Sequence, residues 1–292
     1  MKPAPFDYVR AESIEHAVAT LASAGPEAKI IAGGQSLMPM INFRLVKPSV
    51  LLDINAIAGL DQIEDLGNRL RLGALVRHRM TAADPVIARD IPVLHETMKN
   101  VAHLTVRNRG TFCGSVCHAD PAAEMPMMAL LLDGQVHIAG PDGARTLAAS
   151  EFLTGSLTNA LDADEMVTAV DIAKPAPGTG WGFAEFARRH GDYALAAVAV
   201  LLDRIDGVAR NVRIAVMGVG EMASRVATAE AALEGAVPTP AVIAQAVAAL
   251  RGSIEPLSDI CASADYRRHL VGVLAARVIA EAWARADERL AA

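Results

Sequence analysis

The chain has 292 residues, of which 52% are hydrophobic and 21% are charged, and its formal net charge at pH 7 is −6. This composition is typical of a globular protein, and the length suggests about two domains, each large enough to bury its own core. Lys and Arg are spread along the chain, so the basic surface that nucleic-acid binding needs is not indicated.

The sequence also bears on the compartment. The segment MKPAPFDYVR carries Pro and Asp where a signal peptide needs an apolar core. The best candidate for a membrane span, residues 194–202, is far shorter than the roughly 18 to 20 apolar residues that a span requires. Three cysteines, Cys113, Cys117 and Cys261, are too few for a disulfide framework and fit a reducing compartment. We therefore expect a cytoplasmic protein.

The N-terminal part alternates helix-like and strand-like segments. Residues 13–24 carry apolar side chains at helical spacing. Short apolar runs at 28–34 and 49–55 predict strands, so this region should form a small α/β unit. Residues 63–76 predict a hairpin, because a Gly-Asn pair interrupts two alternating segments.

The middle of the chain predicts more helix and one further hairpin. Residues 92–103 have the pattern of a helix. A second helix is predicted to begin at Asp120-Pro121, because Asp is a good N-cap, Pro suits the first helical position and Glu124 then lies in the first turn. Residues 135–147 predict a hairpin around a Pro-Asp-Gly turn.

A Pro/Gly-rich connector at 174–180 separates this part from the rest, and we place a domain boundary there. Beyond it, apolar runs at 193–203 and 211–220 predict paired strands. The remainder is rich in alanine and predicts helices over 224–234, 239–251 and 263–290.

Two small-residue turns, AGGQS at 32–36 and GTFCGS at 110–115, are the strongest chemical signal. Glycine lets the backbone approach a ligand closely, and successive free amides form a concavity that holds phosphate. Gln35, Ser36 and Thr111 add hydrogen-bonding side chains. Neither turn is a Walker A loop or a GxGxxG motif, because the required Lys and glycine spacings are missing. The pair predicts a phosphate-bearing ligand held between the two turns.

Three stretches carry a family resemblance: KIIAGGQSLMPMINFRLVKPSVLLDIN, RNRGTFCGSVCHADPAAEMP and ARRHGDYALA. Together they resemble the FAD-binding medium subunit of the molybdenum hydroxylases, the family of carbon monoxide dehydrogenase, xanthine dehydrogenase and N-heterocycle dehydrogenase. The resemblance extends from about residue 2 to about residue 288, with the motifs in the family's order and spacing.

The resemblance implies an α+β fold. The expected architecture is the vanillyl-alcohol-oxidase-type FAD-binding fold over residues 1–175, made of two α/β subdomains at about 1–55 and 56–175. A C-terminal flavoprotein domain with a three-stranded antiparallel sheet and helices is expected over 176–292.

The resemblance also implies a set of FAD-binding positions. The first loop would wrap the pyrophosphate, and the second would complete the cradle. Glu124 falls where the family usually has Asp, at the adenosine end. Leu161 would contact the ring system, and Tyr193 matches an aromatic residue that covers the isoalloxazine ring in some members. The full set is Lys29, Ile30, Ile31, Ala32, Gly33, Gly34, Gln35, Ser36, Ala102, Thr111, Phe112, Cys113, Gly114, Ser115, Glu124, Leu161 and Tyr193.

Two positions depart from the family's pattern. Cys113 stands where the family has glycine, so a positive φ at that position would be strained at a cost of about 1 kcal/mol. Gln35 stands where His is frequent and keeps a hydrogen-bonding side chain. Neither change removes the phosphate cradle, and we expect FAD to bind. The CGSVCH stretch lacks the second ligand pair of a zinc or iron–sulfur site, so no metal is predicted in this chain.

The function implied is that of an electron-transfer subunit, an oxidoreductase component with no catalytic acid or base of its own. In this family, a large subunit carries the molybdenum cofactor and a small subunit carries [2Fe–2S] clusters. Electrons pass from the clusters through FAD to an external acceptor. A dimer of heterotrimers is implied as the assembly. Two alternatives stay open: a stand-alone flavin oxidase or reductase of the same fold, and a flavin-free scaffold subunit, which Cys113 favours.

Overall fold

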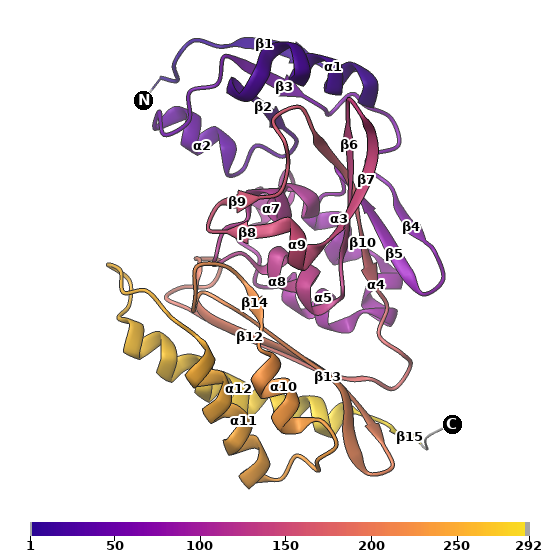
Figure 1. The fold of residues 1–292 in the computed structure, drawn as a ribbon, viewed down its shortest axis with the longest axis vertical. Helices are drawn as coiled ribbons and strands as arrows, with labels where there is room; N and C mark the ends of the chain where they lie inside the picture. Colours follow the sequence, from indigo (N-terminus) through magenta and orange to yellow (C-terminus); the bar gives the residue numbers. More distant parts are fainter. Residues whose placement is uncertain (1, 290–292) are drawn as a thin grey trace.

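The computed structural model describes residues 2–289 and shows three sheets stacked along the long axis of the molecule (Figure 1). The N-terminal layer is a three-stranded parallel sheet in the order β1-β3-β2, from β1 (Asp7–Arg10), β2 (Ala28–Ile31) and β3 (Val50–Asp53). Helix α1 (Ile14–Ala24) packs on β3, and α2 (Leu37–Asn42) follows the first small-residue turn. Ser13 caps α1 by accepting a hydrogen bond from the amide of His16.

The middle layer is a five-stranded antiparallel sheet in the order β4-β5-β10-β6-β7. A two-stranded ribbon and seven helices lie beside it within the described chain. The strands are β4 (Ile63–Asp65), β5 (Arg69–Gly73), β6 (Gln135–Gly140), β7 (Gly143–Ala148), β8 (Leu153–Gly155), β9 (Thr158–Asn159) and β10 (Met166–Ala173). The helices are α3 (His78–Ala83), α4 (Pro85–Asp90), α5 (Pro92–Thr97), α6 (Leu104–Arg107), α7 (Phe112–His118), α8 (Glu124–Leu131) and α9 (Ala149–Phe152).

The C-terminal layer is built on β11 (Gly180–Ala187), β12 (Ala194–Ile205) and β13 (Val208–Met217), paired antiparallel in that order. Two short strands, β14 (Ser224–Arg225) and β15 (Glu288–Arg289), extend the sheet. The sheet is covered by α10 (Ala227–Leu233), α11 (Pro240–Ser253) and α12 (Ala264–Arg285).

Strand β12 is apolar along most of its length because both of its faces are covered. Helix α12 contacts it from one side, and α8 of the middle layer contacts it as well. Gly182 on β11 allows the close approach of α12, since a Cβ there would lie 2.6 Å from the carbonyl oxygen of Val278. The C-terminal layer is therefore packed against the layer that carries the second loop.

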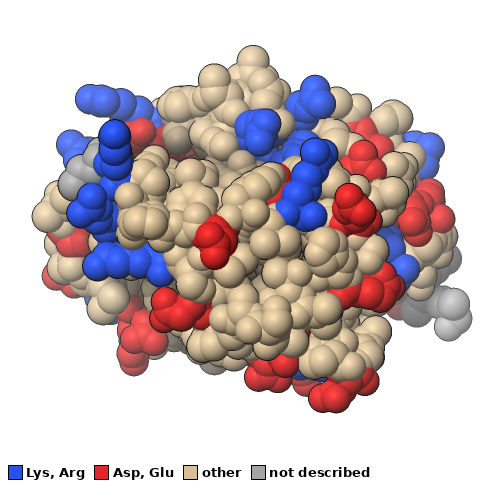
Figure 2. Space-filling view, turned by 90° about the horizontal axis from the view of Figure 1, so that it is seen from above, with Lys and Arg blue, Asp and Glu red and all other residues tan. Residues whose placement is uncertain are grey.

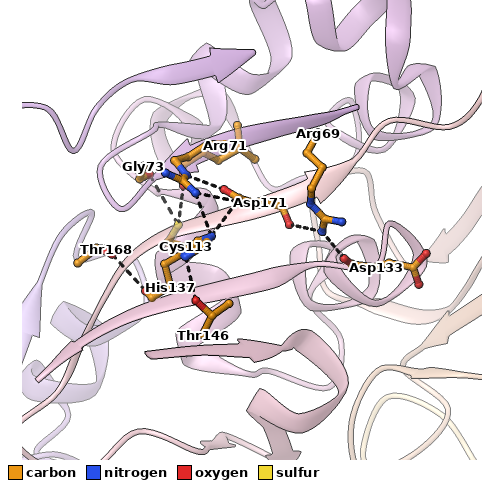
Figure 3. A network of polar contacts seen from close by, with 10 residues as sticks. Arg69, Arg71, Gly73, Cys113, Asp133, His137, Thr146, Thr168 and Asp171 are labelled. Atoms are coloured by element: carbon orange, nitrogen blue, oxygen red, sulfur yellow. Dashed lines mark hydrogen bonds and ion pairs between the residues drawn. The ribbon is translucent and has the colours of Figure 1, made fainter. Parts of the chain in front are cut away.

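A polar network fixes the register of the middle sheet (Figure 3). Asp171 on β10 accepts two hydrogen bonds from Arg71 on β5, at 2.7 and 2.8 Å, and contacts the Nε2 atom of His137 on β6 at 2.8 Å. Thr146 on β7 lies 3.1 Å from the other ring nitrogen of His137. Burial opposes ionisation of Asp171, but the bonds from Arg71 and His137 hold the pKa of this carboxyl below its usual range. The network joins four neighbouring strands.

The expected α+β fold class is confirmed, and most helices and strands begin and end close to the predicted residues. Five predictions were wrong in detail. The helix expected over 224–234 starts at Ala227, after β14, and the helix expected over 263–290 ends at Arg285, before β15. The helix expected over 92–103 ends at Thr97, and the helix expected to start at Asp120 starts at Glu124. Asp120 instead closes a turn, in which its Oδ1 atom accepts from the amide of Ala122 at 2.8 Å. The C-terminal sheet has two short strands beyond the three expected.

The surface carries both signs of charge. Figure 2 looks down on the N-terminal layer, where Lys and Arg side chains are interspersed with Asp and Glu around broad uncharged areas. None of the described helices is long and apolar enough to cross a membrane.

Candidate cofactor site

The two small-residue turns, far apart in the sequence, touch each other in the fold. A Cβ built on Gly33 would lie 2.4 Å from the carbonyl oxygen of Arg109 and 2.8 Å from the Cα of Gly110. Real Cβ atoms do not approach other heavy atoms this closely, so no residue larger than glycine fits at position 33 without moving one loop. The fold thus brings the two loops into contact, as a ligand held between them would require.

The first loop presents unused hydrogen-bond donors. It leaves β2 at Ile31 and turns at Gly34, whose φ is 70°, into α2. Across residues 2–289, no acceptor is found for the four successive main-chain amides from Gly33 to Ser36. Ser36 is the N-cap of α2, yet its hydroxyl makes no capping bond. Adjacent free amides at a helix start form a concavity suited to phosphate.

The second loop is held in place by hydrogen bonds to the segment around the start of α3 and by a cap at the start of α7. The carbonyl of Gly110 accepts from the amide of His78 at 2.9 Å, and the amide of Phe112 donates to Val76 at 3.1 Å. Thr111 caps α7 by accepting from the amide of Gly114 at 3.0 Å. The side chain of Phe112 is fully buried in the core, so this residue can meet a ligand only through its main chain.

Cys113 does not strain the second loop, because the condition for strain, a positive φ at this position, is not met. The residue lies in the first turn of α7 and is absent from the positions with positive φ among the described residues. Its thiol is buried and donates to the carbonyl of Leu72 on β5 at 3.3 Å (Figure 3). Burial, and then the neighbouring Cys117, raise the pKa of the Cys113 thiol well above its usual range. The side chain is a small buried group that points toward the middle sheet.

A second cluster, beside α6, contains the predicted residues Ala102 and Tyr193 together with Gly191. Ala102 has a φ of 43°, and its carbonyl accepts from Arg107 at 2.9 Å. Gly191 packs directly on this turn, since a Cβ there would lie 2.6 Å from the ring of His103 and 3.0 Å from the carbonyl oxygen of Ala102. Tyr193 follows two residues later and is 64% exposed.

Two carboxyl groups, those of Asp120 and Glu124, lie near Tyr193. Burial, and then Asp120, raise the pKa of Glu124 to about 7, and burial followed by Glu124 raises the pKa of Glu185 to about 8. The Oε2 atom of Glu185 is buried, with no hydrogen-bond partner in the described part of the chain. Desolvation, Asp120 and Glu124 raise the pKa of the Tyr193 phenol as well. Glu124 and Tyr193 therefore lie within electrostatic reach of each other, together with Glu185, which the sequence analysis did not select.

The remaining predicted residues flank these two clusters. Leu161 is partly buried against the core; its amide donates to the side chain of Asn159, which in turn donates to the carbonyl of Cys117 in α7 at 2.7 Å. Gln35 is exposed and folds back, donating to the carbonyl of Gly33 at 3.2 Å. Lys29, Ile30, Ile31 and Ala32 run along β2 into the first loop, and Gly114 and Ser115 lie in the first turns of α7.

The chain matches two family models in succession. Residues 4–175 match the FAD binding domain in molybdopterin dehydrogenase, and residues 181–282 match the CO dehydrogenase flavoprotein C-terminal domain. The chain belongs to this flavoprotein family. The family resemblance found in the sequence is thereby confirmed, and the protein is an FAD-binding medium subunit of the molybdenum hydroxylases.

Individual relatives match over nearly the whole chain. The nicotine 6-hydroxylase medium subunit of Paenarthrobacter nicotinovorans is 41% identical over 285 residues, covering 98% of this chain and all of the relative. Carbon monoxide dehydrogenase from Hydrogenophaga pseudoflava superposes with a TM-score of 0.96 at 34% identity, over 98% of this chain and 100% of that one. Quinoline 2-oxidoreductase from Pseudomonas putida 86 superposes with a TM-score of 0.92 at 39% identity, over 97% and 99% of the two chains.

The residues of this medium subunit suit FAD at both ends of the site. The free amides of the first loop provide donors for a pyrophosphate, and the Gly33–Gly110 contact leaves no room there for a side chain. The turn at Ala102 and the loop at Tyr193 provide small and aromatic surfaces for a flat ring. Sequence reasoning missed Glu185, although an acidic residue inside the apolar strand GWGFAEFA was a usable signal.

Proposed function

We propose that this chain holds FAD between its two loops and relays electrons within a molybdenum hydroxylase, from [2Fe–2S] clusters in a small partner subunit to an external acceptor. A large partner subunit would carry the molybdenum cofactor, and the assembly would be a dimer of heterotrimers. The observation that supports this most is the row of free amides from Gly33 to Ser36, on a loop that packs against the second loop.

Different residues of the site would bind different parts of FAD. The first loop would hold the pyrophosphate through its main-chain amides and the hydroxyl of Ser36, and the start of α7 would add the hydroxyl of Thr111. Glu124 lies in the first turn of α8, where it would meet the adenosine part, and Ala102, Leu161 and Tyr193 would frame the ring system. When bound, FAD supplies redox chemistry that no amino-acid side chain offers. The contribution of the protein is to fix the ring and to limit access of water to it.

The domain arrangement belongs to the same proposal. Residues 1–175 would bind FAD, with the first loop in subdomain 1–55 and the second in subdomain 56–175. Residues 176–292 would form the C-terminal domain, which adds Tyr193 and Glu185 from β11 and the loop that follows it. The proposed location is the cytoplasm, supported by three cysteines that are all free thiols.

A visible spectrum of the purified chain tests the proposal. We expect the absorption bands of oxidised flavin, with stoichiometric FAD released on heat denaturation. An affinity-tagged chain should also co-purify with a molybdenum-containing large subunit and an iron–sulfur small subunit. In that complex, reduction of the clusters should be followed by reduction of the flavin in stopped-flow absorption.

Other results would favour the alternatives. A protein that is colourless and fails to take up FAD, both alone and in the complex, would be the flavin-free scaffold. A flavin-bearing chain that turns over a substrate without partners would be a stand-alone oxidoreductase. In that case Glu185, a carboxyl with a raised pKa near the proposed ring position, is the first residue to substitute.

A further inference from the structure

Arg77 connects the two loops, although neither the sequence motifs nor the family models single it out. It lies just before α3, in an isolated bridge with Thr111 of the second loop. One guanidinium nitrogen, Nη1, donates to the carbonyl of Arg109 at 2.5 Å, and the other, Nη2, donates to the side-chain oxygen of Asn55. A planar guanidinium can hold two acceptors at a fixed separation, which a lysine ammonium cannot do.

Asn55 carries the connection on to the first loop. Its Nδ2 atom donates to the carbonyl of Ala32 at 2.9 Å and to Oδ1 of Asp53 at 2.6 Å. Both of these partners only accept, whereas Arg77 only donates, so the orientation of the Asn55 amide is determined by its neighbours. Asp53 is itself held by the hydroxyl of Tyr8, at 2.5 Å. The path from Ala32 to Arg109 therefore runs through just two side chains.

This path ends on both sides of the contact between the loops. Ala32 precedes Gly33, and the Arg109 carbonyl oxygen is the atom that a Cβ on Gly33 would strike. The distance between the free amides of the first loop and the start of α7 thus depends on the two bonds of the guanidinium. A shift of either loop would change the width of the proposed cradle.

Arg77 forms no ion pair with another of the described residues. The guanidinium is partly buried, and it forms hydrogen bonds to neutral oxygens. Burial and the nearby cations Arg109 and Arg79 lower the pKa of Arg77, an effect that Asp53 and Asp61 oppose less strongly. A partly buried cation in such surroundings is favourable when an anion lies close by.

We propose that Arg77 and Asn55 form a clamp that sets the spacing of the two loops for the FAD pyrophosphate. The inference rests on the proposed function, because the anion that the clamp serves is the cofactor. Arg77 and Asn55 are positioning residues: they act through the Arg109 and Ala32 carbonyls, and the positive charge of Arg77 adds a favourable field at the cradle.

Binding of FAD to four variants of the full-length chain tests the clamp. Arg77→Lys keeps the charge but loses the two-pronged geometry, and Asn55→Ala removes the bridge to the first loop. Each should weaken FAD binding about 10-fold, the usual effect of losing a hydrogen bond to a charged group. The double variant should be weaker than either single one by no more than about 3-fold, since both act on one bridge.

Arg79→Ala is the matched control. Arg79 lies two residues along, in α3. The substitution removes a positive charge from the same neighbourhood, but no hydrogen bond joins the Arg79 side chain to either loop within the described chain. Its affinity for FAD should stay within about 2-fold of the wild type at physiological salt. The melting temperature of each variant is measured with and without FAD, because a merely structural role would lower both values equally.

The clamp is supported when the FAD-dependent rise in melting temperature shrinks for Arg77→Lys and Asn55→Ala while the FAD-free value changes little. It is refuted when Arg79→Ala weakens binding as much as Arg77→Lys, or when both clamp variants bind FAD like the wild type. A wild-type chain that binds no FAD, alone or in its complex, would instead refute the proposed function.

Discussion

Replacing Gly33 by alanine should damage the cofactor site more than any other single methyl group. The added Cβ would lie 2.4 Å from the carbonyl oxygen of Arg109, 2.8 Å from the Cα of Gly110 and 3.0 Å from the carbonyl carbon of Arg109. All of these are main-chain atoms, which cannot rotate away as the end of a side chain can. The two loops must therefore separate.

The overlap between the added Cβ and the second loop sets the expected loss of FAD affinity and of stability. A comfortable contact between a methyl carbon and an oxygen is about 3.4 Å, so the loops must part by roughly 1 Å. Hydrogen bonds to an anion tolerate only a few tenths of an ångström, so we expect about two of the cradle bonds to be lost. At about 1.5 kcal/mol each, this loss corresponds to about 100-fold weaker FAD binding. The FAD-free chain should lose about 1–3 kcal/mol of unfolding free energy from the forced contact.

Flavin fluorescence titration measures the affinity, and urea unfolding of the FAD-free chain measures the stability. Gly252→Ala in α11 is the control, because no heavy atom lies within 4 Å of its Cβ position. That variant should bind FAD normally and gain about 0.5–1 kcal/mol of stability. If Gly33→Ala bound FAD as tightly as wild type, the two loops would not form the phosphate cradle.

Two further predictions concern other parts of the site. The raised pKa values of Glu124 and Glu185, about 7 and 8, mean that the folded chain binds more protons than the unfolded one, so the free energy of unfolding should fall as pH rises from about 4.5 to 8. Urea unfolding at pH 5.5 and 8.5 should show that Glu185→Gln reduces this loss of unfolding free energy. The expected reduction is on the order of 1–2 kcal/mol, a small value because water screens a partly exposed carboxyl. An unchanged pH dependence would contradict the prediction. Cys113→Gly should lower the free energy of unfolding by about 1–2 kcal/mol, from a lost buried group and a glycine in a helix, and leave FAD affinity unchanged. Tighter FAD binding by Cys113→Gly would show that the thiol does strain the loop.

Local signals in the sequence were sufficient for most of the elements. The cap at Ser13 and the apolar spacing behind it identified α1, and the Gly-Asn and Pro-Asp-Gly turns identified both hairpins of the middle sheet. These features depend on neighbours within a few residues, which is the range in which capping and turn chemistry act. Asp120 misled because an Asp-Pro pair begins helices and turns alike, and here it forms a turn before α8.

Contacts between residues far apart in the sequence could not be predicted from the sequence. Arg77 and Asn55 form the bridge between the loops only because β3, α3 and the second loop meet in space. Strain at Cys113 depended on a positive φ, which the glycine of the family pattern left open. The backbone there is helical, so a side chain is tolerated. A position requires glycine only where its φ is positive, and the residue type found there in a relative does not give the value of φ.

The two ends of the site differ in charge. We therefore expect pH to act differently on the binding of FAD and on its reduction. The phosphate end consists of main-chain amides beside the cation Arg77, so its strength should vary little between pH 6 and pH 9, roughly the range in which neither amides nor arginine titrate. The ring end is bordered by Glu185, whose raised pKa of about 8 places its ionisation within that range. Negative charge there opposes the addition of electrons to a nearby group. The contribution of the phosphate end to FAD affinity should therefore be nearly independent of pH, while the ease of reducing the bound cofactor should fall as Glu185 ionises.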